Sequence, residues 1–195
     1  MTAFPTVITH NFHSERGAFK NICSLPRPEA EVILDEIRAT GTRNIKANYL
    51  TRRHAVESWL IRESKKKVNA ITLSRPIYFF LGDFADGKDS SRPQSCVIPL
   101  HYFPQDVLTF TYPDSMASLP IALEDKHLPH RREYHGQVFT LEEIQAVVAE
   151  HGLPNDRWKH DPARQYDRFI EVQVWNDAPI KRFLRDSNNP LSLSM

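Results

Sequence analysis

The chain has 195 residues, of which 41% are hydrophobic and 25% are charged, and its formal net charge is +1. This length allows one domain with a sizeable core and is short for two. The near-neutral charge excludes a strong overall field toward a polyanionic partner, and two cysteines, Cys23 and Cys96, are too few for a disulfide scaffold. No apolar run approaches the roughly 18 residues of a membrane span, and no signal peptide is visible, so we expect a cytoplasmic protein without a membrane partner.

The predicted elements are short apolar strands and amphipathic helices. Runs of β-branched or aromatic residues indicate strands, and apolar residues spaced by three or four indicate helices. The clearest helix starts at the capping box of Thr140 and Glu143. In chain order the sequence predicts a strand at 6–9 ending at His10, a helix at 29–39, a helix at 51–67, strands at 77–81, 96–100 and 107–111, an irregular Pro-rich tract at 112–129, a helix at 140–151 and a strand at 169–175.

The organisation of these elements indicates a single α+β domain. Strands and helices are interspersed, and neither an internal repeat nor a linker is visible. The run Ile77–Leu81 is continuously apolar, which is typical of a central strand buried on both faces. We expect one domain over residues 1–185, followed by a polar, frayed tail over 186–195.

Glu171 interrupts the last predicted strand. The apolar residues Ile170, Val172 and Val174 alternate with Glu171 and Gln173, which therefore lie on the opposite face. Glu has a low strand propensity. The pattern alone favours a solvent-exposed face, and the alternative is a cleft that holds Glu171 with Gln173 as its polar neighbour.

Basic residues are concentrated around the second predicted helix. Residues 41–70 contain eight Lys and Arg against two Glu. Guanidinium groups bind phosphate in a bidentate way, so Arg52 and Arg53 are candidates for a phosphate site. Lys65, Lys66 and Lys67 either contact a nucleic-acid backbone or form a solvated helix face.

His10 and His13 form a His-x-x-His pair after the first predicted strand. Imidazole binds zinc readily, but no second cluster of His, Cys or carboxylates has matching spacing. We therefore interpret them as polar loop residues and expect no metal.

The order of these features resembles that of the DarT-type ADP-ribosyltransferase toxins, which transfer ADP-ribose from NAD to nucleic-acid bases. The shared order is a strand leading to His10, an Arg-bearing helix, an aromatic strand at Tyr78–Phe80, the segment 108–114 and a late strand with Glu171. The resemblance spans about residues 6 to 185. This chain departs from the family at Thr9, where the family has an aromatic residue, and at Leu81-Gly82-Asp83, which replaces a Pro-Arg-Ser-Pro-type continuation.

The resemblance implies an ADP-ribosyltransferase-like fold, a split mixed β-sheet with flanking helices and an NAD cleft between its halves. Glu171 would be the catalytic glutamate, and Arg53 or its neighbour Arg52 would serve NAD and the reaction. The other residues implied to bind NAD are His10, Tyr78 and Phe79, with Gln173 as an accessory. Residues 155–166 would present the target.

Three functions follow as hypotheses. The first is an NAD-dependent mono-ADP-ribosyltransferase that modifies DNA or RNA, as the toxin of a toxin–antitoxin or phage-defence system with a possible antitoxin partner. The second is an enzyme of the same fold that hydrolyses NAD or modifies a protein. The third is a non-catalytic nucleic-acid-binding module built on Lys65, Lys66 and Lys67.

Overall fold

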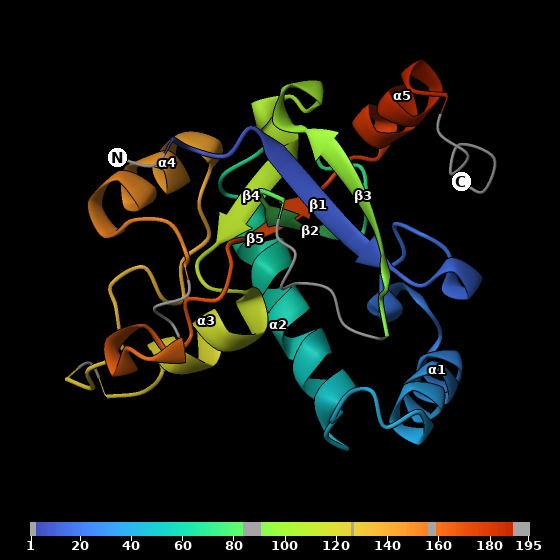
Figure 1. Ribbon diagram of the computed structural model, residues 1–195, viewed down its shortest axis with the longest axis horizontal. Helices are drawn as coiled ribbons and strands as arrows, with labels where there is room; N and C mark the ends of the chain where they lie inside the picture. The colour runs from blue at the N-terminus through green and yellow to red at the C-terminus, as the bar shows by residue number, and fades with distance from the viewer. Residues whose placement is uncertain (1–2, 84–90, 126, 156–158, 189–195) are drawn as a thin grey trace.

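The computed structural model describes residues 3–83, 91–125, 127–155 and 159–188. Within them the chain forms one five-stranded sheet flanked by five α-helices (Figure 1). The strands are β1 (Val7–Phe12), β2 (Ile77–Leu81), β3 (Gln94–Pro99), β4 (Leu108–Thr111) and β5 (Glu171–Val174). The α-helices are α1 (Arg27–Ala39), α2 (Tyr49–Ser64), α3 (Ser115–Ala122), α4 (Leu141–His151) and α5 (Ala178–Asp186). The short 3-10 helices are η1 (Ser14–Arg16), η2 (Ile22–Ser24), η4 (Leu100–Tyr102), η5 (Gln105–Val107) and η7 (Pro162–Arg164).

The sheet has the strand order β3–β1–β2–β5–β4, and every neighbouring pair in it is antiparallel. The predicted α+β class and the central position of Ile77–Leu81 are confirmed. The expectation of a mixed sheet is wrong for the described strands. A sequence pattern shows which segments are strands but not the direction in which they pair, because both directions place side chains on alternate faces.

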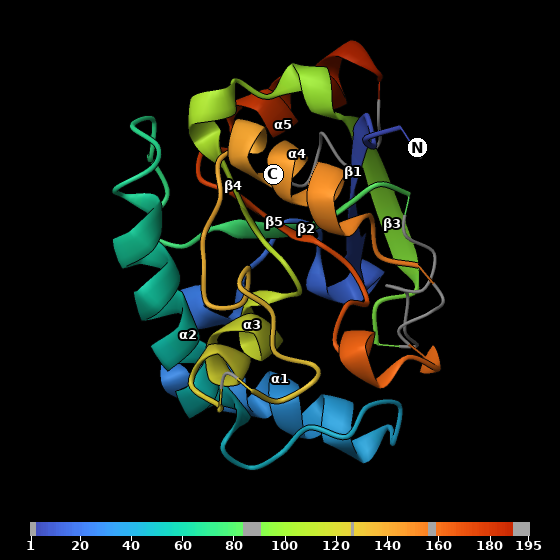
Figure 2. The same ribbon diagram turned by 90° about the vertical axis from the view of Figure 1, so that its left-hand side faces the viewer.

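Helices cover both faces of the sheet, as Figure 2 shows with α4 and α5 on one side and α2 and α3 on the other. On the first side, Ile170, Val172 and Val174 belong to the same apolar core as residues of α4 and α5. On the second side, Trp175 packs with Val56, Trp59 and Leu60 of α2. Glu171 and Gln173 alternate with the first set and share the face of Trp175, so they point toward α2 and α3. None of the described helices is long and apolar enough to cross a membrane.

Three predicted boundaries are wrong. The first strand does not end at His10 but continues to Phe12, because β1 pairs with β3 along its whole length. The tract 112–129 is not irregular throughout, since Asp114 accepts hydrogen bonds from the backbone of Met116 and Ala117 and so starts α3. The predicted tail starts at residue 186, but α5 extends to Asp186, and residues 189–195 lie outside the described residues.

The sheet opens between β1 and β2. Their pairing is limited to Ile8 with Leu81 and Thr9 with Phe80, whereas β1 pairs with β3 over six residues. Beyond Thr9 the ring of His10 replaces the next backbone contact, with Nδ1 2.8 Å from the carbonyl oxygen of Tyr78. The opening therefore divides the sheet into a β3–β1 part and a β2–β5–β4 part.

Candidate active site

A cavity of about 290 Å³ lies at this opening. It is lined by His10 of β1, by Tyr78 of β2, by Glu171 of β5 and by Arg53 of α2. These residues lie far apart in the sequence, and the fold brings them to one space. Further lining residues come from the segments around η2 and α1 and from the start of α3.

Glu171 is 7% exposed, so the interpretation of a solvated strand face is wrong. Its Oε1 accepts hydrogen bonds from the Gln173 amide at 3.0 Å and from the backbone N–H of Ser115, the first residue of α3, at 3.4 Å. Burial raises the pKa of Glu171, Arg53 lowers it, and the carboxylate of Asp114 raises it again. The strand pattern misled because α2 and α3 cover this face of the sheet.

Gln173 is fully buried and continues a polar ladder beneath Glu171. Its side-chain oxygen accepts a hydrogen bond from Thr109 at 3.0 Å, and its amide also donates to Thr111 at 3.2 Å. Thr109 in turn accepts from the indole N–H of Trp175 at 2.8 Å. All these groups are buried and bonded, so the ladder fixes the Gln173 amide, which fixes the Glu171 carboxylate.

Arg53, and not Arg52, faces the cavity. Arg53 is 8% exposed, and its guanidinium lies 4.0 Å from the centre of the Tyr78 ring. Burial disfavours its charge, but Tyr78, Glu171 and other acidic neighbours outweigh burial and raise its pKa. Arg52 is exposed, because neighbouring residues of a helix point about 100° apart.

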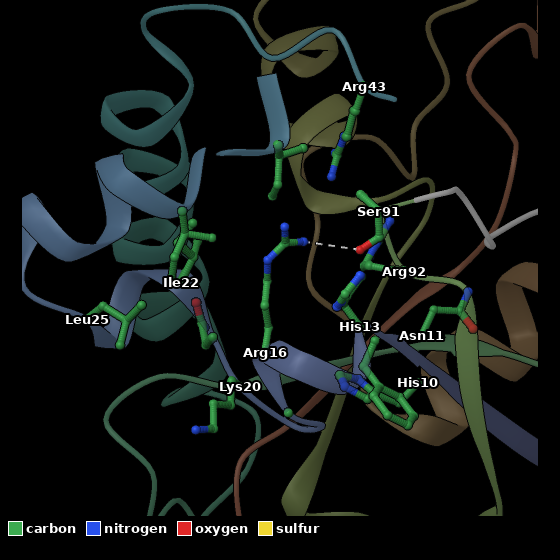
Figure 3. A pocket seen from close by; sticks show the side chains of 15 residues that line it. His10, Asn11, His13, Arg16, Lys20, Ile22, Leu25, Arg43, Ser91 and Arg92 are labelled. Atoms are coloured by element: carbon green, nitrogen blue, oxygen red, sulfur yellow. Dashed lines mark hydrogen bonds between the residues drawn. The ribbon is translucent and has the colours of Figure 1, made fainter. Parts of the chain in front are cut away.

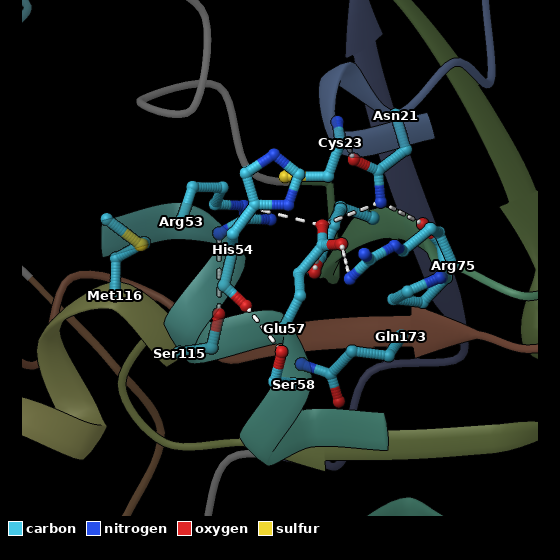
Figure 4. A network of polar contacts seen from close by, with 12 residues as sticks. Asn21, Cys23, Arg53, His54, Glu57, Ser58, Arg75, Ser115, Met116 and Gln173 are labelled. Carbon is cyan, nitrogen blue, oxygen red and sulfur yellow. Dashed lines mark hydrogen bonds and ion pairs between the residues drawn. The ribbon is translucent and has the colours of Figure 1, made fainter. Parts of the chain in front are cut away.

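Glu57, which is fully buried on α2, was not identified from the sequence (Figure 4). Its carboxylate accepts hydrogen bonds from Asn21 at 2.7 Å, from the Tyr78 hydroxyl at 2.9 Å and from Arg75 at 3.1 Å, and it lies 3.7 Å from Arg53 Nε. Glu57 thus connects α2 to β2 and to the segment before η2. Its spacing of four from Arg53, on a helix stripe that is otherwise apolar, is the signal that could have identified it.

Three aromatic residues of β2, Tyr78, Phe79 and Phe80, line the cavity beside Arg53. Tyr78 carries the guanidinium on its ring face, and burial raises the pKa of its hydroxyl well above the usual value. Phe79 is 1% exposed, stacks on the ring of Phe19 and lies tilted against the ring of His10. The cavity therefore has an aromatic wall on the β2 side.

His10 lines the cavity, but both of its ring nitrogens are used within the protein. Nδ1 donates to the carbonyl of Tyr78, and Nε2 accepts from the backbone N–H of Phe19 at 2.8 Å. Burial lowers the pKa of His10 to about 4, so the ring is neutral at pH 7. In this arrangement neither nitrogen is free for a ligand, and the nitrogens cannot also coordinate a metal with His13.

A second cavity of about 180 Å³ continues the first toward η1 and α1 (Figure 3). The two cavities share residues of β1, Lys20, Arg43 and Arg92 among others. The smaller one adds Arg16, and none of its described lining residues is acidic. Apolar side chains of α1 and of the segment before it form its opposite wall. This part of the groove is suited to an anion that carries an apolar group.

Lys65, Lys66 and Lys67 follow the far end of α2. A helix rises about 1.5 Å per residue, so Ser64 lies about 16 Å from Arg53 along the axis. Lys66 pairs with Glu63 at 2.7 Å, Lys67 pairs with Glu143, and Lys65 is exposed. None of the three lines either cavity.

One group of possible metal ligands occurs among the described residues. It consists of Glu133, Glu150 and His151, whose ligand atoms lie within 4.8 Å of one another. Both glutamates are exposed, and none of the three residues lines the cavities at the sheet opening. The group is thus separate from the candidate active site.

Comparison of the chain with models of known protein families, with curated proteins and with solved structures gave no match.

Proposed function

We propose that the chain is an NAD-dependent mono-ADP-ribosyltransferase with an ADP-ribosyltransferase-like fold. The observation that carries the proposal is the conjunction of buried Glu171 and Arg53 with half-buried Tyr78 in one cavity where the sheet opens. Cleavage of the nicotinamide–ribose bond develops positive charge on the ribose, as glycoside hydrolysis does. A fixed carboxylate such as Glu171 stabilises that charge most strongly in the transition state.

The dimensions and charges of the groove support NAD as the substrate. The smaller cavity offers cations for the pyrophosphate and an apolar wall for the adenine. In the larger cavity the aromatic wall of Tyr78 and Phe79 would pack against nicotinamide and exclude water. The face of the neutral His10 ring would contact the ribose or nicotinamide without adding charge.

As the acceptor we propose a base of DNA or RNA, in a toxin of a toxin–antitoxin or phage-defence system that acts in the cytoplasm. A base must leave its stack to reach an enclosed site, so a single strand or a flipped base is required. The segment 155–166 precedes β5 and would present this acceptor, although residues 156–158 lie outside the described residues. Lys65, Lys66 and Lys67 remain predicted backbone contacts.

The test combines calorimetric titration with NAD and transfer of labelled NAD to DNA, RNA and protein. Glu171→Gln keeps the shape and both hydrogen-bond partners but removes the charge, so transfer should fall about 1,000-fold. Glu142→Gln, at an exposed position of α4, is the matched control and should transfer at the wild-type rate.

Each alternative function gives a different result in these assays. Nicotinamide release without a labelled acceptor identifies a glycohydrolase, and labelled protein identifies a protein-directed transferase. Salt-sensitive nucleic-acid binding without NAD binding identifies a non-catalytic module. Unchanged transfer by Glu171→Gln contradicts the proposed catalytic residue.

A further inference from the structure

A second carboxylate, that of Asp114, lines the same cavity as Glu171. Asp114 precedes α3, and its Oδ1 accepts the backbone N–H groups of Met116 and Ala117 at 3.1 and 3.2 Å. The next residue, Ser115, donates its N–H to Glu171. The start of α3 therefore holds both acidic groups, and because both capping bonds end on Oδ1, Oδ2 is left for a partner in the cavity.

Asp114 lies away from the end of the groove that Arg16 occupies. Asp114, Met116 and Phe169 line the larger cavity and not the smaller one. Arg16 lines only the smaller cavity, which would hold the distal part of NAD, whereas Lys20 and Arg43 line both cavities. Asp114 thus lies toward the opposite end, where a second substrate can meet the ribose.

We propose that Asp114 is a further catalytic residue, the general base that accepts the proton of the acceptor nucleophile. This inference rests on the proposed transferase function. The C1′–N bond of NAD breaks, and its electron pair leaves with neutral nicotinamide. A lone pair on nitrogen or oxygen of the acceptor forms the new bond to C1′. The proton of that atom passes to Asp114 Oδ2 and reaches solvent after the product leaves.

Two carboxylates with separate tasks suit this reaction better than one. Glu171 must keep its negative charge beside the ribosyl cation, and it would lose that charge if it also took the acceptor's proton. Each carboxylate accepts two hydrogen bonds on one oxygen, Oε1 of Glu171 and Oδ1 of Asp114, so the second oxygen of Glu171 would hold the ribose while that of Asp114 takes the proton. Burial raises the pKa of the Asp114 carboxyl, while Arg53, the helix amides and Arg168 lower it. Burial outweighs these neighbours, so the Asp114 carboxyl takes up a proton more readily than an exposed aspartate does.

The arrangement also restricts the class of acceptor. A nucleophile that reaches Asp114 must carry a removable proton on nitrogen or oxygen, such as an exocyclic amine, a ring N–H or a hydroxyl. A ring nitrogen without a proton would not need Asp114. Met116 and Phe169 line the same cavity, and their side chains would pack against the flat ring of a nucleobase.

The proposed role of Asp114 as general base can be tested with substitutions that keep its role as the N-cap of α3. Asn and Ser cap helices about as well as Asp, so Asp114→Asn and Asp114→Ser should fold like the wild type. The control is Asp125→Asn, since Asp125 also accepts a backbone N–H, from His127 at 2.9 Å, but does not line the cavities. Single-turnover transfer, calorimetric NAD affinity and rescue by added formate are measured for each variant.

We expect Asp114→Asn to slow transfer about 100-fold and to leave NAD affinity within about twofold. Added formate should raise the transfer rate of Asp114→Ser about 10-fold, because the smaller side chain leaves space for a small carboxylate. It should not raise the rate of Asp114→Asn. Asp125→Asn should match the wild type. A restored rate is not expected from a purely structural role.

The outcomes separate this inference from the function on which it rests. If the wild type transfers and Asp114→Asn transfers equally fast, Asp114 is not the base and the transferase stands. An NAD affinity that falls as far as the rate, with no rescue by formate, also overturns the inference. If the wild type neither cleaves nor transfers NAD, the proposed function fails first.

Discussion

Two buried clusters in this molecule combine an arginine, tyrosine and a carboxylate. They differ in whether the arginine nitrogens form short hydrogen bonds within the protein. In the first cluster, which surrounds Glu57, the nearest polar partners of Arg53 are long, with 3.7 Å from Nε to Glu57 and 3.5 Å from Nη1 to Ser115. The carboxylate itself is fully bonded by Asn21 and Tyr78 among others. The guanidinium therefore keeps donor capacity toward the cavity.

In the second cluster, which surrounds Asp167, the arginine donates a hydrogen bond from each of its three nitrogens. Arg164 donates from Nε to Asp167 at 2.8 Å, from Nη2 to the Tyr112 hydroxyl at 2.6 Å and from Nη1 to the carbonyl of His151 at 3.2 Å. Tyr134 adds a hydrogen bond to Asp167 at 2.9 Å and stacks on Tyr112. This closed cluster connects the segment before β5 to the ends of β4 and α4.

The difference teaches that burial and charge alone do not identify a functional arginine. Both clusters are buried and ionic, and both perturb pKa values. Arg53 and Tyr78 of the Glu57 cluster line the cavity at the sheet opening, and Arg53 has no short hydrogen bond to a described residue there, whereas Arg164 and Asp167 do not line that cavity. Unused donors on a fixed guanidinium are what a bound anion requires.

The same substitution in both clusters tests this comparison and should give the largest effects. Arg164→Met leaves Asp167 without its ionic partner, so we expect the free energy of unfolding to fall by about 3 kcal/mol, with NAD affinity within about twofold of the wild type. Arg53→Met should weaken NAD binding about 100-fold and destabilise less, because Glu57 keeps Asn21, Tyr78 and Arg75 as donors. Urea unfolding and calorimetry measure the two quantities.

If Arg164→Met instead weakens NAD binding while Arg53→Met mainly destabilises the fold, the roles of the clusters are reversed.

The sequence predicted the elements better than the clusters, for a physical reason. A continuous apolar run located β2, and the capping box of Thr140 located the start of α4, because both signals depend only on residues near one another in sequence. Whether Glu171 faces solvent depends on α2 and α3, which cover its face of the sheet and which no strand pattern records. Only the resemblance placed Glu171 in a cleft, and neither approach identified Glu57, whose partners come from segments distant in sequence.

His10 lines the cavity as Arg53 does, but both of its ring nitrogens form short hydrogen bonds within the protein, as the nitrogens of Arg164 do. Its folded-state pKa of about 4 is below the ordinary value of 6.5. The unfolded chain therefore binds a proton first as pH falls, and stability present above pH 6.5 is lost between pH 6.5 and about 4. The loss from this residue should reach about 3 kcal/mol.

Urea unfolding between pH 7 and pH 4 checks the prediction for His10. The difference between wild type and His10→Gln isolates its contribution, because His135, whose pKa burial also lowers to about 4, acts in the same direction in both proteins. Parallel stability curves for the two proteins would contradict the neutral, saturated ring.

The smallest effects are expected where charges are neither buried nor near the cavity. Replacing Lys65, Lys66 and Lys67 together by Ala should change the free energy of unfolding by less than about 1 kcal/mol, since their ion pairs are exposed. NAD affinity should not change. Binding of single-stranded oligonucleotides should weaken, and its salt dependence should become shallower, if these lysines contact phosphates.

Fluorescence anisotropy at several salt concentrations measures this binding. The control is Lys181→Ala, a lysine of α5 that is also ion-paired, with Asp177 at 2.7 Å, on the opposite side of the sheet. If the triple variant keeps the wild-type salt dependence, the lysines form a solvated helix end. The acceptor would then be held by residues of the larger cavity itself, such as Asp114, Met116 and Phe169. The same cavity, with Arg53 of the Glu57 cluster on its wall, would in that case bind both NAD and the acceptor.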